Sequence, residues 1–500
     1  MHDIKNKELI KSGSFINGYW LTTDKPSEQF KVINPATQVC LNSIHNAQKN
    51  DAETAVEAAA ATFPSWTKLT AYERADHLTA WAKLITEHEQ DLARLLTLEQ
   101  GKPVAEALSE IRYGVSYLHW FSEEGKRSYG DIIPALSSQQ KILVNKQAVG
   151  VVTSITPWNF PSAMLLRKVS VALAAGCTFV IKPAADTPLS ALALAHLAKV
   201  AGLPDGIFNV VVSTESAEVG KVLTMHPKVN KFSFTGSTGV GKTLLAQCAE
   251  GVKKVSMELG GNAPLIVFES AEIDAAVNGL ISNKFKNAGQ ICVAINRVFV
   301  HNSIASEFTK KVIEATKLIK SGNGLDSTTD IGPLITQQAV DKVSSLVSSA
   351  IEQGAEIAYQ SELTLSNKDE AHDSLKADGF YPATVLTNVN NEMDIAQTEI
   401  FGPVISIMTF EDETEVVEQA NATDAGLASY FYSQNMNQVW RVSDALQYGM
   451  VGINETALSN AAAPFGGIKE SGSGREGSKY GLDDYLEIKY LCLGGIEQKS

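Results

Sequence analysis

Val149-Gly-Val-Val-Thr-Ser-Ile155 is a short apolar run rich in β-branched residues, and runs of this kind recur through the middle of the chain. The next three are Cys177-Thr-Phe-Val-Ile181, Phe208-Asn-Val-Val-Val212 and Lys231-Phe-Ser-Phe-Thr235. Between them lie the helix-like segments Ser190–Ala201 and Ser216–Thr224. Buried strands that alternate with helices predict βαβ units and a parallel sheet covered on both faces. The pattern recurs from Pro264 to about Ile453, which predicts a second α/β domain.

The segments outside this region have different sequence patterns. Asp51–Ala61 is rich in Ala and Glu, and Glu73–Leu98 repeats apolar residues near helical spacing, so we expect both to be helical. Gly101-Lys-Pro103 is predicted to end the second helix. Ser361–Asp378 is polar and aperiodic, which favours an exposed loop. Asp483–Cys492 is β-prone, and an unpaired strand there would present an edge that tends to associate with other chains. Another subunit is one partner that could pair with it.

Composition excludes several classes of protein. A chain of 500 residues predicts two or three domains, and its net charge of −14 lacks the basic footprint that nucleic-acid binding needs. The five cysteines are scattered without a CxxC pair, so we expect neither a disulfide framework nor a zinc site, and no metal. The N-terminus lacks an apolar signal segment and no apolar run approaches a membrane span. We therefore expect a cytoplasmic protein that binds neither membrane nor nucleic acid.

Two motifs carry residues suited to covalent chemistry on a carbonyl group. Cys292 lies in Lys286-Asn-Ala-Gly-Gln-Ile-Cys-Val293, and Glu258 lies in Met257-Glu-Leu-Gly-Gly-Asn-Ala-Pro264. A thiolate can attack a carbonyl carbon, and a carboxylate can act as general base in the hydrolysis that follows. The alternatives are a small buried hydrophobe for a lone Cys and a solvated charge for a lone Glu. We apply the first of these to the remaining cysteines, Cys40, Cys177, Cys248 and Cys492.

A third motif has three interpretations. Gly236-Ser-Thr-Gly-Val-Gly-Lys-Thr243 matches the P-loop pattern and follows a strand-like run, which by itself predicts an NTPase with Lys242 on the terminal phosphates. A Gly-rich turn at a helix N-terminus can instead bind the pyrophosphate of a dinucleotide. It can also be a tight turn that needs Gly for its conformation alone. The motif does not decide between them.

Several segments together resemble the aldehyde dehydrogenase superfamily, in its order and spacing. They are Pro157-Trp-Asn-Phe-Pro161, Lys182-Pro-Ala184, Phe234-Thr-Gly-Ser-Thr238, Glu399-Ile-Phe-Gly-Pro403 and the motifs around Glu258 and Cys292. The resemblance covers nearly the whole chain, and Thr97-Leu-Glu-Gln-Gly-Lys-Pro103 and Gly474-Arg-Glu-Gly-Ser-Lys-Tyr-Gly481 are most similar to bacterial succinate-semialdehyde dehydrogenases. With the family pattern complete, we favour the dinucleotide interpretation of the Gly-rich turn and regard Lys242 as a solvated helix residue. A non-catalytic member of the fold would be expected to lack Cys292, Glu258 or Asn159, and all three are present.

The resemblance implies a fold of two Rossmann-like α/β domains and a small β oligomerisation element. The dinucleotide-binding domain would comprise 1–132 and 150–257, and the catalytic domain 258–452. The bridging element would comprise 133–149 and 476–494, in a homodimer or homotetramer.

The resemblance also implies roles. Cys292 would be the nucleophile, Glu258 the hydrolytic base, and Asn159 would donate to the oxyanion together with the backbone N–H of Cys292. A nicotinamide dinucleotide would be bound by Trp158, Lys182, Ala185, Gly236, Ser237, Leu259, Glu399 and Phe401.

The choice between NAD and NADP depends on the residue after Lys182-Pro-Ala184. A Glu there would repel a 2′-phosphate, whereas Ala185 neither repels nor donates; Lys182 could attract the phosphate and Asp186 could oppose it. Since bacterial relatives tend towards NADP, we favour NADP.

The implied substrate is succinate semialdehyde, with glutarate semialdehyde or another ω-carboxyl aldehyde as the alternative. In the resembled subgroup, two arginines and a serine usually grip the distal carboxylate. Arg167 and Ser459 match one arginine and the serine, but Lys286 stands at the second arginine position, which keeps the charge and loses the bidentate geometry. Ala294 replaces a second cysteine that many relatives carry beside the nucleophile, so we predict no local disulfide switch.

Overall fold

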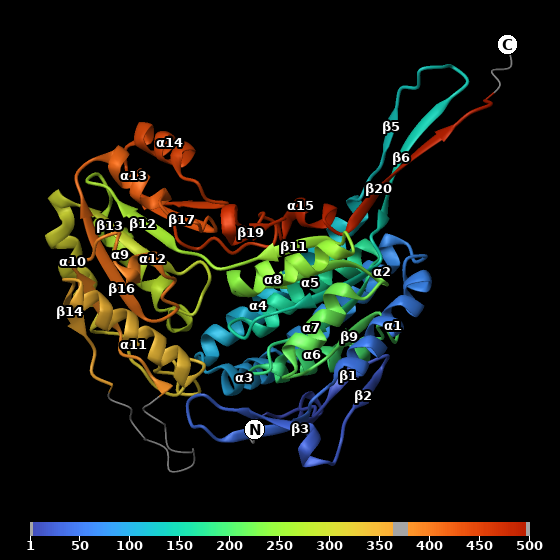
Figure 1. Cartoon of the computed structure of the whole chain (residues 1–500), viewed down its shortest axis with the longest axis horizontal. Helices are drawn as coiled ribbons and strands as arrows, with labels where there is room; N and C mark the ends of the chain where they lie inside the picture. Colours follow the sequence, from blue (N-terminus) through green and yellow to red (C-terminus); the bar gives the residue numbers. More distant parts are fainter. Residues whose placement is uncertain (1–3, 364–378, 497–500) are drawn as a thin grey trace.

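The computed structural model describes residues 4–363 and 379–496, and its strands form two large sheets and two small ones. Most of the predicted loop Ser361–Asp378 lies outside the described residues. The two large sheets lie in separate bodies of the molecule, with a third element projecting from one of them (Figure 1).

The first large sheet has eight strands in the order β19-β11-β10-β7-β8-β9-β1-β2. The bounds are β1 Ser14–Ile16, β2 Tyr19–Leu21, β7 Val151–Ile155, β8 Thr178–Lys182, β9 Phe208–Val210, β10 Val229–Thr235, β11 Lys254–Glu258 and β19 Gly472–Ser473. The five central strands are parallel, with Ile155 opposite Lys182 and Thr235 opposite Glu258. Loops that follow neighbouring parallel strands therefore emerge at one edge of the sheet.

The second large sheet has seven strands in the order β14-β15-β16-β13-β12-β17-β18. The bounds are β12 Ala263–Val267, β13 Ile295–His301, β14 Glu356–Gln360, β15 Thr384–Thr387, β16 Val404–Phe410, β17 Ala428–Tyr432 and β18 Met450–Ile453. All its pairings are parallel except β14 with β15. The two sheets confirm the predicted fold class of two α/β units.

Helices cover these sheets and fill the space between them. They are α1 Lys49–Trp66, α2 Ala71–Glu87, α3 Glu89–Gln100, α4 Val104–Glu124, α5 Pro161–Ala175, α6 Pro188–Val200, α7 Ser216–Met225, α8 Thr238–Glu250, α9 Ile273–Lys284, α10 Asn302–Thr316, α11 Gln337–Glu352, α12 Asp394–Gln397, α13 Glu413–Asn421, α14 Met436–Ala445 and α15 Ser478–Asp483. Every residue of α5 is buried, because it packs against α2, α4 and α6 and beneath β8. Within the described ranges, no helix is both long and apolar enough to span a bilayer.

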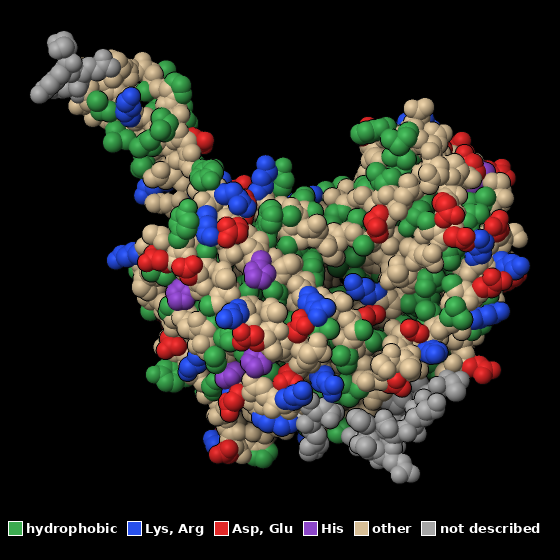
Figure 2. Space-filling model, turned by 180° about the vertical axis from the view of Figure 1, so that it is seen from behind, with side chains coloured by type: hydrophobic (Ala, Val, Ile, Leu, Met, Phe, Trp, Pro, Cys, Tyr) green, Lys and Arg blue, Asp and Glu red, His purple; other side chains and the backbone are tan. Residues whose placement is uncertain are grey.

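A three-stranded arm stands clear of the two bodies (Figures 1 and 2). It is formed by β5 (Asp131–Ile133), β6 (Lys141–Ala148) and β20 (Leu486–Leu493), in the order β20-β6-β5. The predicted β-strand near the C-terminus is confirmed, and its partner in the chain is β6. A fourth sheet pairs β3 (Gln29–Ile33) with β4 (Cys40–His45). The division into domains stays a prediction.

The predicted strand runs all overlap observed strands, whereas one predicted helix is wrong. Glu73–Leu98 is two helices, α2 and α3, because His88 leaves the helical conformation at φ −106° and ψ 10°. The predicted stop at Gly101 is confirmed: its φ of 98° lies in the left-handed region that favours glycine.

Candidate active site

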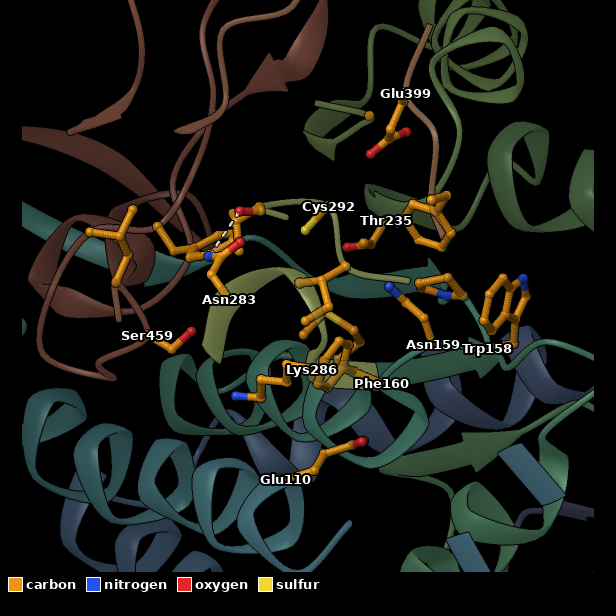
Figure 3. Close-up of a pocket in the computed structure, with 18 of the residues that line it drawn as sticks. Glu110, Trp158, Asn159, Phe160, Thr235, Asn283, Lys286, Cys292, Glu399 and Ser459 are labelled. Atoms are coloured by element: carbon orange, nitrogen blue, oxygen red, sulfur yellow. Dashed lines mark hydrogen bonds between the residues drawn. The ribbon is translucent and has the colours of Figure 1, made fainter. Parts of the chain in front are cut away.

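A cavity of about 730 Å³ lies between the two bodies. It brings together most of the residues predicted from sequence: Trp158, Asn159, Arg167, Gly236, Ser237, Leu259, Lys286, Cys292, Glu399, Phe401 and Ser459. Figure 3 shows the Cys292 sulfur and the Asn159 amide directed into the same space. Glu258, Lys182 and Ala185 are not part of this lining.

Cys292 is presented by an unusual turn directly before β13. Asn287, Ala288 and Gly289 are consecutive left-handed residues with φ of 50°, 53° and 76°, a conformation that costs energy for the two that are not glycine. A Cβ on Gly261 would lie 2.4 Å from the Cys292 carbonyl oxygen, so only glycine allows this approach. Burial, reinforced by the Glu399 carboxylate, raises the pKa of the Cys292 thiol to about 12. The resting sulfur is therefore a neutral thiol at neutral pH.

Asn159 lies in the loop that follows β7. Its Nδ2 donates to the Gln290 carbonyl at 3.0 Å, which leaves one N–H of the amide for another acceptor. Its own carbonyl accepts from Lys102 Nζ at 2.7 Å and from Asn287 Nδ2 at 3.0 Å. The arrangement can hold a positioned donor beside the thiol, as an oxyanion site requires.

Glu258 ends β11 and is buried, and the next residue, Leu259, lines the cavity. Its Oε2 has no hydrogen-bond partner among the described residues. Burial first, and then the negative charge of Glu476, raise the pKa of Glu258 well above its ordinary value. A raised pKa makes the ionised carboxylate a stronger base, which suits a general base.

A group of buried charges lies beside Glu258. The Glu476 carboxylate accepts from Lys168 Nζ and, at 3.0 Å, from Arg167 Nη1. Sequence reasoning assigned no role to Glu476 or Lys168. The signal was available for Glu476, which lies in the motif Gly474–Gly481 used for the resemblance. Lys168 had no signal of its own beyond its place next to Arg167.

The residues expected to bind a distal anion differ in whether their side chains already form hydrogen bonds or ion pairs. Arg167 lines the cavity, but its guanidinium already bonds Glu476 and the Tyr113 hydroxyl (2.9 Å) and lies 4.2 Å from the centre of the Phe465 ring. Lys286 and Ser459 are exposed and form no hydrogen bond or ion pair in the described parts of the chain. Both lie on one side of the cavity (Figure 3). Lys286 is thus the cation most available to an incoming anion.

The opposite side of the cavity suits a dinucleotide. Ser237 is the N-cap of α8, whose first backbone N–H groups are open to an anion, and Gly236 precedes it. The Thr235 hydroxyl is buried, faces the cavity and lacks a partner among the described residues. Trp158 and Phe401 form an edge-to-face pair with ring centres 5.7 Å apart. Burial raises the pKa of Glu399 to about 7, and its Oε1 accepts from the Gly261 N–H at 3.3 Å.

The residues expected at the adenosine end lie apart from this cavity. Lys182 ends β8 in a buried position, and burial lowers its pKa to about 8. Ala185 and Asp186 line a separate cavity of about 570 Å³, together with Lys31. The negative charge of Asp186 opposes the lowering of the pKa of Lys182.

The P-loop interpretation receives no support from Lys242. Its ammonium forms an ion pair with Glu470 at 2.7 Å on the surface, and more than half of its side chain is exposed. Among the described residues, no cluster of three or more His, Cys, Asp or Glu could hold a metal ion.

Comparison with known proteins gives matches over almost the whole chain. A family profile described as the aldehyde dehydrogenase family matches residues 20–491. A 3-sulfolactaldehyde dehydrogenase from Pseudomonas putida is 51% identical over 100% of both chains. An NADP(+) succinate-semialdehyde dehydrogenase from Escherichia coli is 48% identical, over 98% of this chain and 99% of its own. A crystal structure described as an E. coli NADP-dependent enzyme has a TM-score of 0.94 and 48% identity, covering 98% of this chain and 100% of that one.

Proposed function

The chain belongs to the aldehyde dehydrogenase family of oxidoreductases, and from this premise we propose that it oxidises succinate semialdehyde to succinate with NADP. The observation that carries the proposal is the cavity in which a half-buried thiol, an amide donor and an exposed ammonium converge, those of Cys292, Asn159 and Lys286. Enzymes of this family act on aldehydes and use NAD or NADP. The finer assignment of substrate and coenzyme is our inference.

In the proposed reaction, Cys292 releases its proton to solvent and its sulfur attacks the aldehyde carbon, so that the carbonyl oxygen becomes an oxyanion. Asn159 Nδ2 and the Cys292 backbone N–H donate to that oxygen. A bound nicotinamide would supply the acceptor for the hydride that leaves the carbon, and Cys292 would then carry the acyl group as a thioester. Glu258 then takes a proton from water; the hydroxide attacks the thioester carbon, and the acid and the free thiol are released.

The lining residues fit the coenzyme at named positions. Gly236, Ser237 and Leu259 would hold the pyrophosphate side, and Trp158, Glu399 and Phe401 the nicotinamide side, as in the resembled family. Lys182, with Ala185 beside it, would attract a 2′-phosphate and Asp186 would oppose it. We infer NADP from the uncharged Ala185 and from the E. coli relative named for that coenzyme.

A second candidate substrate is an aldehyde with a sulfonate in place of the carboxylate. The P. putida relative is named for such a substrate. A sulfonate presents three oxygens around sulfur, so a compact ammonium such as Lys286 can bind it without the planar fork that a carboxylate prefers. This favours testing 3-sulfolactaldehyde beside the two semialdehydes.

The experiment is an aldehyde panel run with both coenzymes. Succinate semialdehyde, glutarate semialdehyde, 3-sulfolactaldehyde and uncharged butanal are compared by kcat/KM from reduced-coenzyme absorbance. The proposal expects succinate semialdehyde with NADP to be the best pair. A higher kcat/KM for another anionic aldehyde, or for NAD, would replace that part of the assignment; oxidation of none of them would remove it.

We also propose a cytoplasmic homodimer or homotetramer that uses the arm. Ile132, Leu136, Ile488 and Tyr490 on or beside the strands of the arm are each more than half exposed. Such apolar exposure on a projecting sheet favours burial against a second copy. The proposed domains are those predicted from sequence, with the arm as the bridging element. Light scattering measures the assembly, and a monomer at micromolar concentration would contradict it.

A further inference from the structure

A buried lysine outside the predicted site holds the backbone of Asn159. The Lys102 ammonium donates to the Asn159 carbonyl at 2.7 Å and lies 3.7 Å from the centre of the Phe160 ring. It therefore contacts the peptide group between these two residues and the ring that follows it. Lys102 lies in the motif Thr97–Pro103, which ends a helix and is part of the family resemblance, but no role was predicted for Lys102 itself.

Glu110 pairs with this lysine and joins it to α5. Glu110 Oε2 accepts from Lys102 Nζ at 2.6 Å, and both side chains are 0% exposed. Its Oε1 accepts from the backbone N–H groups of Ser162 and Ala163 at 2.9 and 3.1 Å. These are N–H groups of the first helical turn, which have no partner within the helix. One carboxylate thus fixes Lys102 and the helix that begins just after Asn159.

A second donor, from Asn287, also holds the Asn159 carbonyl, and we call Gln100, Lys102, Glu110 and Asn287 together the frame. Asn287 Nδ2 also donates to the Asn159 carbonyl, at 3.0 Å, and Gln100 Nε2 donates to Asn287 Oδ1 at 2.9 Å. Gln100 Oε1 in turn accepts from the Lys102 backbone N–H at 3.0 Å. Since Asn287 lies in the left-handed turn that leads to Cys292, the frame links the loop of the amide donor to the loop of the thiol.

A buried ion pair such as Lys102–Glu110 is an inefficient way to stabilise a fold. Removing an ion pair from water is unfavourable, and apolar residues of similar volume often stabilise a protein as well or better. Burial lowers the pKa of Lys102, and the Glu110 carboxylate opposes that change. The pair is placed where a fixed peptide orientation has a chemical use.

We propose that Lys102 and Glu110 are positioning residues for the reaction: they fix the Asn159 peptide so that its side-chain amide is aimed at the oxygen that becomes negative. The proposal rests on the proposed function, because it assumes that Asn159 donates to an oxyanion. A donor held in place before the reaction stabilises developing charge better than one that must reorient.

The test is a double-mutant cycle of Lys102→Met with Asn159→Ala. Lys102→Met keeps much of the side-chain volume and removes the donors, and we expect it to lower kcat by roughly 10- to 100-fold with aldehyde KM and coenzyme affinity changed less than about twofold. In the Asn159→Ala background, the same change should lower kcat less than about twofold further, because the amide it positions is gone. Equal losses in both backgrounds would overturn the proposal.

Lys231→Met is the matched control. Lys231 is another fully buried lysine, but it donates to Ser256 and does not contact Asn159. It should change thermal stability without the selective loss of kcat; a loss equal to that of Lys102→Met would overturn the proposal.

Glu110→Gln provides a second route if Lys102→Met does not fold, since it keeps an acceptor for α5 and removes the charge that holds Lys102. The same cycle with Asn159→Ala should again show a loss that disappears in the double variant. If neither variant folds, the pair serves the fold and the proposal fails. A crystal structure gives a readout independent of turnover: Asn159 should be displaced in the folded variant, and an unmoved Asn159 would contradict the positioning role. An inactive wild type would instead refute the proposed function.

Discussion

The two ends of the active-site cavity are built differently. At the Cys292 end, Glu258 and Asn159 are buried and Cys292 is half-buried. Asn159 is held by Gln290 through its side chain and by Lys102 and Asn287 through its carbonyl. At the other end, Lys286 and Ser459 are exposed and make no hydrogen bond in the described chain. A fixed end suits chemistry common to a family, and an open end suits a substrate tail that differs between members. The relatives agree with this contrast, since proteins of about 50% identity are named for different anionic aldehydes.

The largest effect should come from the thiol itself. Cys292→Ala removes the nucleophile that attacks the aldehyde carbon, so we expect aldehyde oxidation to fall below detection, with coenzyme binding retained. Steady-state reduction of coenzyme measures the first, and quenching of protein fluorescence on titration measures the second. Turnover near that of the wild type would contradict the assignment of the fixed end.

Glu258→Gln should separate the two half-reactions. The acylation step does not need water, so a burst of about one reduced coenzyme per active site is expected, followed by turnover that is roughly 10²- to 10⁴-fold slower. Stopped-flow absorbance resolves the two phases. Loss of the burst together with turnover would show that Glu258 acts before hydrolysis.

The pH dependence follows from the raised pKa of Glu258. Only the ionised carboxylate can act as base, so turnover limited by hydrolysis should rise with pH through a range above the ordinary carboxyl pKa.

The Cys292 thiol, with its pKa of about 12, should be alkylated by iodoacetamide in the coenzyme-free protein at a rate that climbs with pH. Alkylation that is already maximal at pH 7 would contradict a neutral resting thiol.

At the open end the expected effects are smaller and selective. Lys286→Ala should raise KM for succinate semialdehyde about tenfold, as expected for loss of one solvent-exposed charged contact, and leave KM for butanal within about twofold. Lys286→Arg is the control that restores the charge and adds a planar fork. Equal KM changes for both aldehydes in Lys286→Ala would argue against an anion contact.

Arg167→Ala should also raise KM for the anion but lower kcat for both aldehydes, because it removes a partner of Glu476.

The smallest effect is expected at the P-loop match. Lys242→Ala removes a surface ion pair with Glu470, and such pairs contribute about 0 to 1 kcal/mol. Activity and coenzyme affinity should stay within about twofold of the wild type. Release of phosphate from ATP that Lys242→Ala abolishes would instead revive the NTPase interpretation.

Sequence alone predicted the strands and most of the cavity because both depend on local patterns. Short β-branched runs specify buried strands, and the Cys292 and Asn159 segments are contiguous motifs. The break at His88 was missed because the helical spacing of apolar residues continues through it, whereas the backbone leaves the helical conformation there. The contact of Lys102 with Glu110 forms across the break between α3 and α4, and that of Arg167 with Glu476 joins residues distant in sequence. No spacing rule reveals that such charges are already paired.

The burial of α5 along its whole length has a consequence for motion. Arg167 and Lys168 extend from this helix, and Glu110 caps its first turn. An element with no solvent-facing side exchanges its amide hydrogens through large-scale opening, whereas exposed segments exchange through small fluctuations. The amides of α5 should therefore be among the slowest to exchange with deuterium, and the catalytic end should keep its shape while the arm and the substrate side fluctuate.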